Sequence, residues 1–393
     1  MDTLGTACRM LGAVAFLLSG CANSPGQGAL SSASSPPASV LPAKADVTSG
    51  ADPMPSLARL YQSYFPVGIA ITPGQVMFGG NTQIAEQFNV VVAENAMKPF
   101  SLNKFGPGRY DFDAADAIVN FAITRGIKVR GHALVWHEQA ADWMFYGSGP
   151  NGDATREELT ERLHTYIRDV VTHFKGRVYA WDVVNEAFIP DEPGKPQIDG
   201  WRQSNWYRIL GPQFIALAFK FAHEADPDAL LFYNDYNTEK PAKRAMILQL
   251  IRDLQTQGVP IHGIGHQSHY TSTNPSDFGS LEETIVQVSN LGLTNHITEL
   301  DISISSNPMT GSEPELTPEL ELEQAQRYHD FFSMCLRQRK NVSAVLMWGL
   351  NDDVSWLRNW PHARFDAPLL FTGEMKPKAA FWAVANLAKS ASH

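Results

Sequence analysis

The feature that most constrains the fold is an alternation of short apolar runs with longer segments of helical periodicity, repeated eight times from about Ser56 onward. Such alternation is typical of β/α units that surround a parallel sheet. The apolar runs predict strands near Pro66–Thr72, Asn89–Glu94, Ile127–Val135, Val178–Val184, Leu230–Tyr233, Gly263–Ser268, His296–Asp301 and Ala344–Leu350. Helical spacing predicts helices over Phe112–Thr124, Arg156–Phe174, Ile215–Ala225, Ala242–Thr256, Leu281–Leu291 and Leu320–Arg337. We therefore predict an α/β fold, a closed (β/α)8 TIM barrel.

Residues 56–393 are predicted to form a single domain, although 393 residues could hold two. A (β/α)8 barrel alone commonly takes about 250 residues, and more with insertions. The content of 44% hydrophobic and 18% charged residues is that of a globular protein with a large core. The net charge of -10 and the lack of a Lys/Arg run argue against nucleic acid as a partner, so a neutral polymer is the more natural one.

Residues 1–21 differ in kind from the rest of the chain. Arg9 is followed by the apolar run Met10–Leu18, which is too short to span a bilayer and predicts an export signal. Leu18-Ser19-Gly20-Cys21 resembles the bacterial lipobox, whose cysteine becomes lipidated. We therefore expect an exported protein that contacts the membrane only through a lipid anchor on Cys21, on the periplasmic or outer-membrane face of the cell envelope. The alternative is ordinary cleavage of the signal, which would leave the protein secreted.

Residues 22–55 are rich in Ala, Ser, Pro and Gly and show no apolar period, so they predict a flexible tether. Of the three cysteines only Cys335 lies in the predicted domain, which excludes a disulfide within it, and its apolar helical surroundings predict burial. The sequence contains no cysteine cluster and no His-Glu-x-x-His. We therefore expect no metal and no cofactor.

Two glutamates stand at the ends of predicted strands, where a packed core would reject a charge. Glu186 ends an apolar run together with Asn185, and Glu299 lies in a second such run about 110 residues later. In a (β/α)8 barrel, polar groups at the carboxyl ends of strands form the active site. Two carboxyl groups placed there are what cleavage of a glycosidic bond requires.

Strand alternation places further polar and aromatic side chains beside these glutamates. His132 aligns with Leu134 and Trp136 on one predicted strand face, and Glu299 aligns with Asp301. On another strand Gln267 and His269 share a face, whereas His266 points to the opposite side. A histidine at such a place is often a hydrogen-bonded core residue, and here the neighbouring acids favour a functional role.

Two more groups offer contacts to sugars. Glu94, Asn95 and Lys98 leave one strand together and present the donors and acceptors that sugar hydroxyls need, although a helix cap or a rim ion pair would look the same. Trp348 and Trp356 place flat apolar faces at the end of the last strand, where the C–H faces of sugar rings can stack. The alternative is that each tryptophan is a core residue that contacts no sugar.

Seven motifs occur in a recognisable order. They are Glu94-Asn95-x-Met97-Lys98, Arg130-Gly131-His132-x-Leu134-Val135-Trp136-His137, Trp181-Asp182-Val183-Val184-Asn185-Glu186, Tyr233-Asn234-Asp235-Tyr236-Asn237, Gly263-Ile264-Gly265-x-Gln267-Ser268-His269, Ile297-Thr298-Glu299-Leu300-Asp301 and Trp348-Gly349. From roughly Leu57 to Leu387 the chain resembles the glycoside hydrolase family 10 endo-β-1,4-xylanases. That resemblance implies the same (β/α)8 barrel.

The resemblance implies that Glu186 is the acid/base and Glu299 the nucleophile of a retaining mechanism. At a carboxyl separation of about 5 to 5.5 Å, an ionised Glu299 would raise the pKa of Glu186 by repulsion. Asn185 would bind the 2-hydroxyl of the sugar at the cleavage point, and His269 would hydrogen-bond the nucleophile while Asp301 fixes its imidazole. The residues implied to bind sugars on the non-reducing side are Glu94, Asn95, Lys98, His132, Gln267, Trp348 and Trp356, with Trp136 at the floor. The segment Leu357–Arg364 has no certain alignment, which leaves the number of subsites open.

The sequence therefore predicts a monomeric retaining endo-1,4-β-xylanase that acts on xylan or xylo-oligosaccharides. One alternative is a β-1,4-glucanase of a related barrel family, against which the motifs at Glu94 and His132 argue. Another alternative is a surface glycan-binding lipoprotein without catalysis. A binder has no need to retain both carboxylates, so Glu186 and Glu299 argue against it.

Overall fold

The computed structural model describes residues 44–49, 54–78, 81–190, 192, 194–307 and 315–391. The predicted signal, Cys21 and most of the predicted tether lie outside these residues. Among the helices of the described part, none combines the length and the apolar character needed to cross a membrane.

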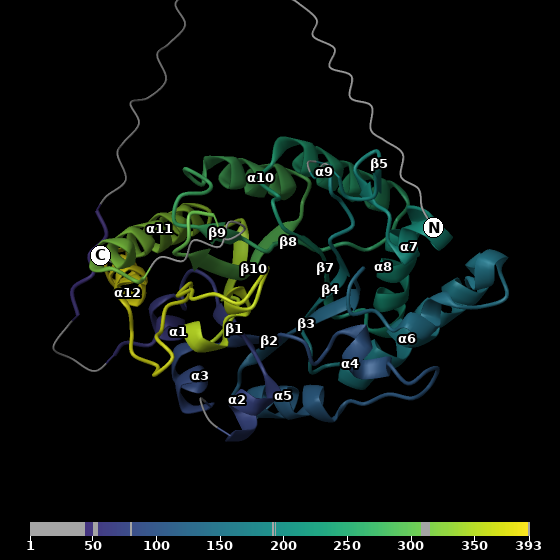
Figure 1. The fold of residues 1–393 in the computed structure, drawn as a ribbon, viewed down its shortest axis with the longest axis horizontal. Helices are drawn as coiled ribbons and strands as arrows, with labels where there is room; N and C mark the ends of the chain where they lie inside the picture. The colour runs from purple at the N-terminus through teal and green to yellow at the C-terminus, as the bar shows by residue number, and fades with distance from the viewer. Residues whose placement is uncertain are drawn as a thin grey trace, which may run out of the picture. The chain divides into compact units, whose positions relative to one another are not determined.

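Eight parallel strands close into a barrel, which confirms the fold expected from the sequence (Figure 1). They are β1 (Val67–Ile71), β2 (Val90–Ala93), β3 (Lys128–Val135), β4 (Ala180–Asn185), β7 (Leu230–Asp235), β8 (Gly263–His266), β10 (Thr294–Ser303) and β11 (Val342–Met347). The last strand pairs in parallel with both β10 and β1, with Val345 opposite Val67, and so closes the ring. All carboxyl ends therefore meet at one mouth of the barrel.

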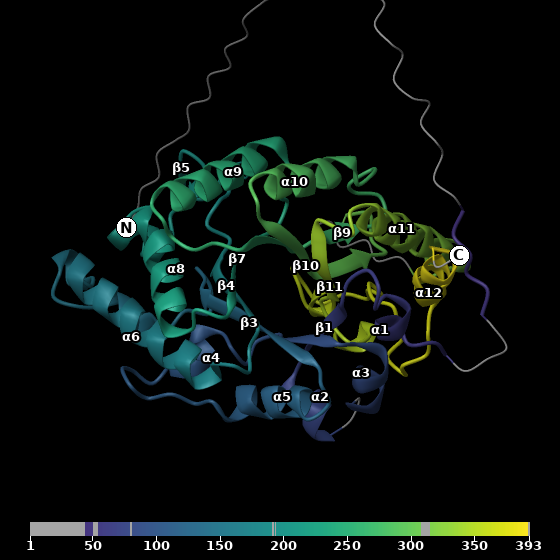
Figure 2. The same ribbon diagram turned by 180° about the vertical axis from the view of Figure 1, so that it is seen from behind.

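Helices surround the strands, as Figures 1 and 2 show. The six that the sequence predicts are α5 (Asp113–Ile123), α6 (Arg156–Phe174), α8 (Gln213–Ala225), α9 (Pro241–Thr256), α10 (Gly279–Asn290) and α11 (Pro318–Arg337). The others are α1 (Leu57–Leu60), α2 (Pro73–Phe78), α3 (Asn81–Gln87), α4 (Pro99–Asn103), α7 (Asn205–Leu210) and α12 (Ala379–Ala391). The start of α6 is fixed by a capping box, in which Thr155 and Glu158 each accept the other's backbone N–H.

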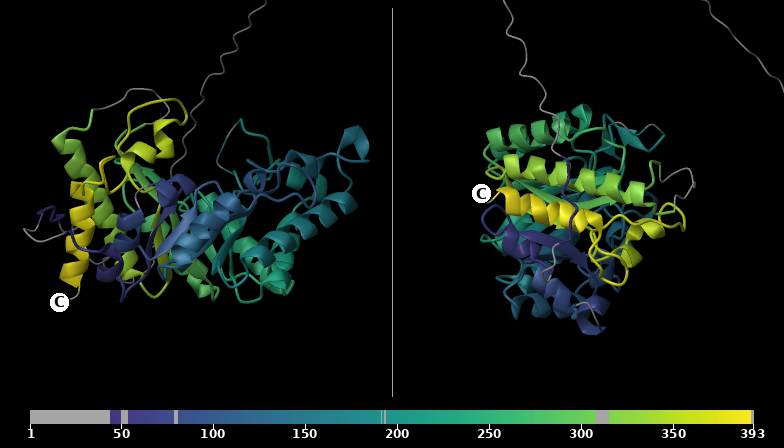
Figure 3. Two further views of the ribbon diagram at one scale, coloured as in Figure 1. Left: turned by 90° about the horizontal axis from the view of Figure 1, so that it is seen from below. Right: turned by 90° about the vertical axis from the view of Figure 1, so that its left-hand side faces the viewer.

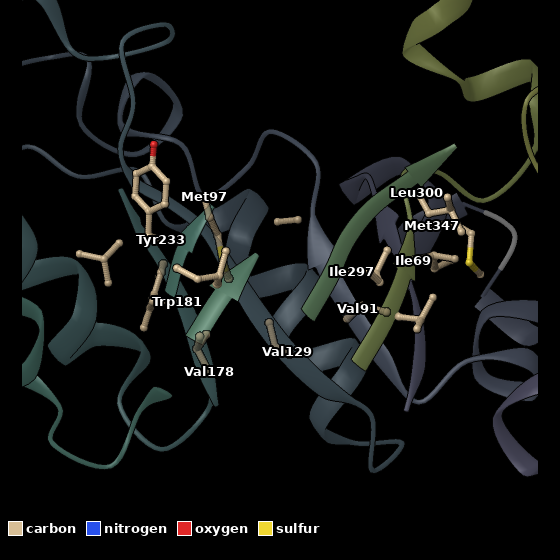
Figure 4. Packing of buried hydrophobic residues seen from close by; sticks show 14 of the residues in the cluster. Ile69, Val91, Met97, Val129, Val178, Trp181, Tyr233, Ile297, Leu300 and Met347 are labelled. Carbon is tan, nitrogen blue, oxygen red and sulfur yellow. The ribbon is translucent and has the colours of Figure 1, made fainter. Parts of the chain in front are cut away.

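The main core lies between the strands and the helices (Figure 4). Trp181 of β4 is fully buried there, and its ring occupies the space beside Gly131 of β3. A Cβ atom at position 131 would lie 2.1 Å from Cε3 of Trp181, so only glycine permits this packing. Cys335 of α11 is buried, as predicted.

The barrel interior below the mouth carries a buried charge. The Arg130 guanidinium is 0% exposed, forms an ion pair with Asp182, lies 4.5 Å from the Phe232 ring and contacts Nδ1 of His296 at 2.7 Å. Burial raises the pKa of Asp182, but Arg130 and His132 outweigh burial and lower it. Because Asp182 also bonds Nδ1 of His132 at 3.0 Å, this buried pair supports the layer of side chains above it.

Two strands depart from simple alternation. The predicted strand Gly263–Ser268 ends at His266, and the chain resumes as β9 (His269–Thr271), which pairs with β10 so that His269 lies opposite Asp301. In β3 the register with β4 shifts between His132 and Val135, and Leu134 packs in the main core. The predicted alignment of Leu134 with His132 is therefore wrong, because the shift breaks the two-residue period.

The described part of the predicted tether contacts the barrel. Residues 44–49 lie against α11 and α12, which run side by side (Figure 3). The backbone N–H of Ala45 donates to Gln326 at 2.8 Å, and Asn386 donates to the carbonyls of Asp46 and Thr48 at 3.1 Å each. Among the described residues, ordered contacts thus begin before the predicted boundary at residue 56.

Candidate active site

The backbone at Glu186 is held in an unusual conformation. Glu186 follows β4 with a φ of 59°, a region that a residue with a Cβ atom rarely adopts. Its N–H donates to the carbonyl of Asn234 at 3.0 Å, and its carbonyl accepts from Nε of Arg202 at 2.9 Å. Arg202 belongs to the short hairpin of β5 (Gln197–Ile198) and β6 (Trp201–Arg202). These two bonds fix the direction in which the Glu186 side chain leaves the strand.

Three side chains donate hydrogen bonds to the Glu186 carboxyl group. Trp136 donates to Oε2 at 3.0 Å, while Gln267 and Asn185 donate to Oε1 at 2.8 and 3.1 Å. Gln267, which the sequence assigns to sugar binding, therefore also positions the predicted acid/base.

The pKa of Glu186 differs from the sequence-based prediction. Burial raises the pKa, but His137, whose Nδ1 lies 3.7 Å from Oε2, and the hydrogen bonds from Gln267 and Trp136 outweigh burial and lower it. The predicted rise of the Glu186 pKa by repulsion from Glu299 is thus wrong for the free protein, because the Arg202 guanidinium and the hydrogen-bond donors also face the carboxyl group.

Glu299 lies in β10 and is almost fully buried, with 4% of its surface exposed. Its Oε1 accepts from Nδ2 of Asn234 at 2.7 Å, and Nδ1 of His132 lies 3.9 Å from the same oxygen. Its Oε2 lies 3.2 Å from Nε2 of His269. A buried carboxylate with these partners is held in one orientation, as a nucleophile requires.

His269 carries a positive charge between two carboxylates. Its Nδ1 bonds Asp301 at 2.9 Å, and its Nε2 bonds Glu299. Burial lowers the pKa of His269, but Asp301 and Glu299 outweigh burial and raise it to about 10. The imidazolium therefore donates from both nitrogens, and Asp301 is itself held by Nε1 of Trp356 at 2.8 Å. The arrangement predicted for His269 and Asp301 is present.

Asn234 connects the two glutamates. Its Nδ2 donates both to Glu299 and to Oδ1 of Asn185, at 2.7 and 2.9 Å, and Asn185 in turn donates to Glu186. Its Oδ1 accepts from Thr298 at 2.7 Å. A Cβ atom at Gly265 would lie 2.2 Å from that Oδ1, so the glycine makes room for the amide.

The residues predicted to bind sugars line the same mouth from β2 and β3. Lys98 is 5% exposed, donates to Asn95 at 2.8 Å and lies 4.6 Å from the ring of Trp136. Asn95 donates to Glu94 at 3.1 Å. Burial lowers the pKa of Lys98 against the opposing effect of Glu299 and Glu94. This is a chain of polar groups that leads from the rim to the Glu186 side of the mouth.

Aromatic rings complete the mouth after β11. Trp348 is 7% exposed, and its ring lies 5.2 Å from that of His132. The ring of Trp356 lies 5.0 Å from that of His269. The sugar-binding residues that the sequence predicts thus surround the two glutamates, whereas Cys21 lies outside the described residues.

The sequence predicts no individual role for Asn234, His137 or Arg202. Asn234 comes directly after the predicted apolar run Leu230–Tyr233 and belongs to the motif at Tyr233–Asn237, and that position is the signal that could have marked it. The contacts of His137 and Arg202 with Glu186 join distant segments and have no local signal. No three His, Cys, Asp or Glu side chains group as metal ligands in the described residues.

A parallel barrel with a donor-held carboxyl group after its fourth strand and a buried carboxylate on its seventh is the arrangement of a barrel glycoside hydrolase. Residues 56–387 match the family described as Glycosyl hydrolase family 10. The chain belongs to this family.

Two relatives and two solved structures are similar to the chain. Endo-1,4-beta-xylanase A of Caldicellulosiruptor sp. is 42% identical over 338 residues, 84% of this chain but only 47% of that protein. Beta-1,4-xylanase of Dictyoglomus thermophilum is 42% identical over 84% of this chain and 90% of its own length. Xylanase B of Clostridium stercorarium F9 superposes with a TM-score of 0.79 at 40% identity, over 84% of this chain and 99% of the other.

The second structure is the intracellular xylanase TsXylA of Thermoanaerobacterium saccharolyticum, a mutant of which is in complex with xylotetraose. It superposes with a TM-score of 0.75 at 37% identity, over 84% of this chain and 98% of that one.

Proposed function

We propose that the chain is a retaining endo-1,4-β-xylanase that hydrolyses internal β-1,4 bonds of xylan or xylo-oligosaccharides. The observation that carries this proposal is the pairing of Glu186 and Glu299 at one mouth, each held by its own donors and joined through Asn185 and Asn234. The family membership and the xylanase names of the relatives support the substrate class.

In the first step the Glu299 carboxylate attacks the anomeric carbon while the bond to the leaving sugar breaks. The proton on Glu186 passes to the leaving oxygen, and the sugar becomes an ester of Glu299. Asn234 and the His269 imidazolium orient the attacking carboxylate by their bonds to its two oxygens. The Asn185 amide, next to the acid/base, would bind the 2-hydroxyl at the cleavage point.

The second step returns the enzyme to its starting state. Glu186 takes a proton from water, the resulting hydroxide attacks the anomeric carbon, and Glu299 leaves as a carboxylate. Glu186 must be protonated at the start of the first step although its pKa is lowered in the free protein. A sugar seated against Glu186 displaces water and adds burial, the influence that raises this pKa, so substrate binding favours the protonated form.

The surrounding side chains define where sugars bind. Glu94, Asn95 and Lys98 offer acceptors and donors to the hydroxyls of sugars on the non-reducing side, and Trp348 and Trp356 offer apolar faces to their rings. The enclosed position of Lys98 over the Trp136 ring makes its ammonium a fixed donor rather than a mobile one.

Hydrolysis of xylan, cellulose and mixed-linkage β-glucan under the same conditions tests this function. We expect reducing ends to be released chiefly from xylan. Faster release from cellulose or mixed-linkage glucan would favour the glucanase alternative, and binding without release would favour the surface glycan-binding protein.

We also propose that the protein is exported and anchored through a lipid on Cys21, and that it acts as a monomer. The sequence Leu18-Ser19-Gly20-Cys21 after an apolar run supports the anchor. No metal or cofactor is needed for the double displacement, since Glu186 and Glu299 supply both the proton and the nucleophile.

A further inference from the structure

Trp360 is an exposed indole in the loop after β11, within a segment that matches none of the family motifs in the sequence. With 47% of its surface exposed, it is among the largest apolar side chains that the described residues present to solvent. A single exposed aromatic residue needs no explanation by itself. The contacts of Trp360 with its neighbours, however, indicate a role in binding.

The ring of Trp360 continues the aromatic surface of the active site. Its centroid lies 5.0 Å from that of Trp356, with 34° between the ring planes, and Trp356 lies at the same distance from the imidazole of His269. His269, Trp356 and Trp360 therefore form one row of rings that runs from the nucleophile outward.

The loop that carries Trp360 is held from below by buried groups. The backbone N–H of Arg364 donates to the carbonyl of Arg358 at 3.0 Å and closes the loop. The Arg364 side chain, 1% exposed, donates to the carbonyl of Trp360 and to Asp366, the latter at 2.9 Å. Asp366 in turn accepts from Ser303 of β10 at 2.6 Å. The loop is thus fixed to the strand that carries Glu299.

An exposed ring on a loop fixed in this way loses little conformational freedom when a ligand covers it, and such preorganisation favours binding. The cations of the loop are already paired, Arg358 with Asp353 at 2.7 Å and Arg364 with Asp366. Trp360 therefore offers an apolar face without an unpaired arginine beside it. Such a face suits the C–H face of a neutral sugar better than it suits an acidic sugar.

We propose that Trp360 is a stacking platform for a neutral sugar ring of the substrate, beyond the sugar that meets Trp356. This inference rests on the proposed xylanase function. The ring has two possible sources with the same chemistry, a further xylosyl unit of the backbone or a neutral branch such as an arabinosyl unit.

The test compares Trp360→Ala and Trp360→Phe with the wild type. The first set of substrates is unbranched xylo-oligosaccharides of increasing length, and the second is oligosaccharides of one backbone length with and without arabinosyl branches. Phe365→Ala is the matched control, because Phe365 is an exposed aromatic residue of the same loop. The readout is the ratio of kcat/KM on the longer or branched substrate to that on the shorter, unbranched one.

We expect Trp360→Ala to lower this ratio by about 10-fold in one of the two sets, as loss of one aromatic contact would, and Trp360→Phe to retain most of it. A drop in the length series identifies a backbone sugar, and a drop in the branched series identifies a branch. Ratios unchanged in both sets, or an equal drop in Phe365→Ala, would overturn the platform. Failure of the wild type to hydrolyse any of these substrates would refute the proposed function instead.

Discussion

The Nδ2 atom of Asn234 lies 2.7 Å from Oε1 of Glu299 and 2.9 Å from Oδ1 of Asn185. One amide of β7 therefore sets the positions of the predicted nucleophile on β10 and of the neighbour of the acid/base on β4. The amide is itself fixed by Thr298 and by the space that Gly265 leaves. The chemistry at the mouth of the barrel thus depends on Asn234, which is neither the acid/base nor the nucleophile but holds Glu299 and Asn185 in position.

Replacing Asn234 by Ala should lower kcat on xylan by about 100-fold, because a small displacement of a reacting carboxylate is enough for such a loss. Steady-state kinetics with thermal unfolding as a check on folding measures this. Asn120→Ala, at an exposed asparagine of α5, is the matched control and should leave kcat unchanged. Gly265→Ala, which would push the Asn234 amide instead of removing it, should lower kcat in the same direction. If folded Asn234→Ala kept wild-type kcat, Asn234 would not position Glu299.

Glu299→Ala and Glu186→Ala should differ in their response to the leaving group. Without Glu299 no ester can form, so turnover of any substrate should fall by at least about 10⁴-fold. Glu186→Ala should lose activity on xylan, by about 10² to 10⁴-fold, yet keep fast formation of the glycosyl-enzyme from an aryl xylobioside, whose leaving group needs little protonation. Burst kinetics measures this step. Equal loss of the burst in both variants would show that the two roles are wrongly assigned.

His137→Gln should shift the pH dependence of kcat/KM. His137 is the largest of the influences that lower the Glu186 pKa, so its replacement should raise that pKa and move the alkaline limb to higher pH. His164→Gln is the matched control, since His164 lies 3.8 Å from Glu224 far from the mouth. A limb that stays in place, or moves to lower pH, would contradict the electrostatic role given to His137.

The elements that the sequence predicted well are those with a long period or a long apolar run. The helical period over Arg156–Phe174 predicted both ends of α6 correctly, because the apolar face of this helix packs on the barrel over its whole length. The short helices α2, α3 and α7 were missed, since six or seven residues cannot show two full turns of periodicity. The shift at His132 and the break after His266 were missed because they depend on pairing with the neighbouring strand.

The candidate site divides in the same way. Glu186 and Glu299 could be found because an acid at the end of an apolar run is costly to bury, so it indicates a functional role. The direction of the Glu186 pKa shift could not be predicted, because His137, Gln267 and Trp136 contact the carboxyl group from other parts of the chain. Their combined lowering of the pKa outweighs the rise that burial causes. The exposure of Trp360 depends on Arg364 and Asp366 beneath its loop, which no local pattern reveals.

Replacing Cys21 by Ser should release the protein from membranes without lowering the specific activity of the barrel. The physical reason is that one cysteine supplies the whole proposed anchor, and none of the active-site contacts described above includes Cys21. Fractionation of cells grown with labelled palmitate measures both label and location. Wild-type protein without label, or a Cys21→Ser variant that remains in the membrane fraction, would refute the lipid anchor.

The stereochemistry of hydrolysis should be retained. If Glu299 forms an ester on the face opposite the leaving sugar, and water then displaces Glu299 from the face that the leaving sugar occupied, the two inversions restore the β configuration. Proton NMR of a fresh reaction on xylan should therefore show the β-anomer of the shorter products first, with the α-anomer growing only as fast as mutarotation allows. Early α-anomer would require a water molecule between carboxyl groups about 6.5 to 9.5 Å apart, as in inverting enzymes, and would exclude Glu299 as the nucleophile.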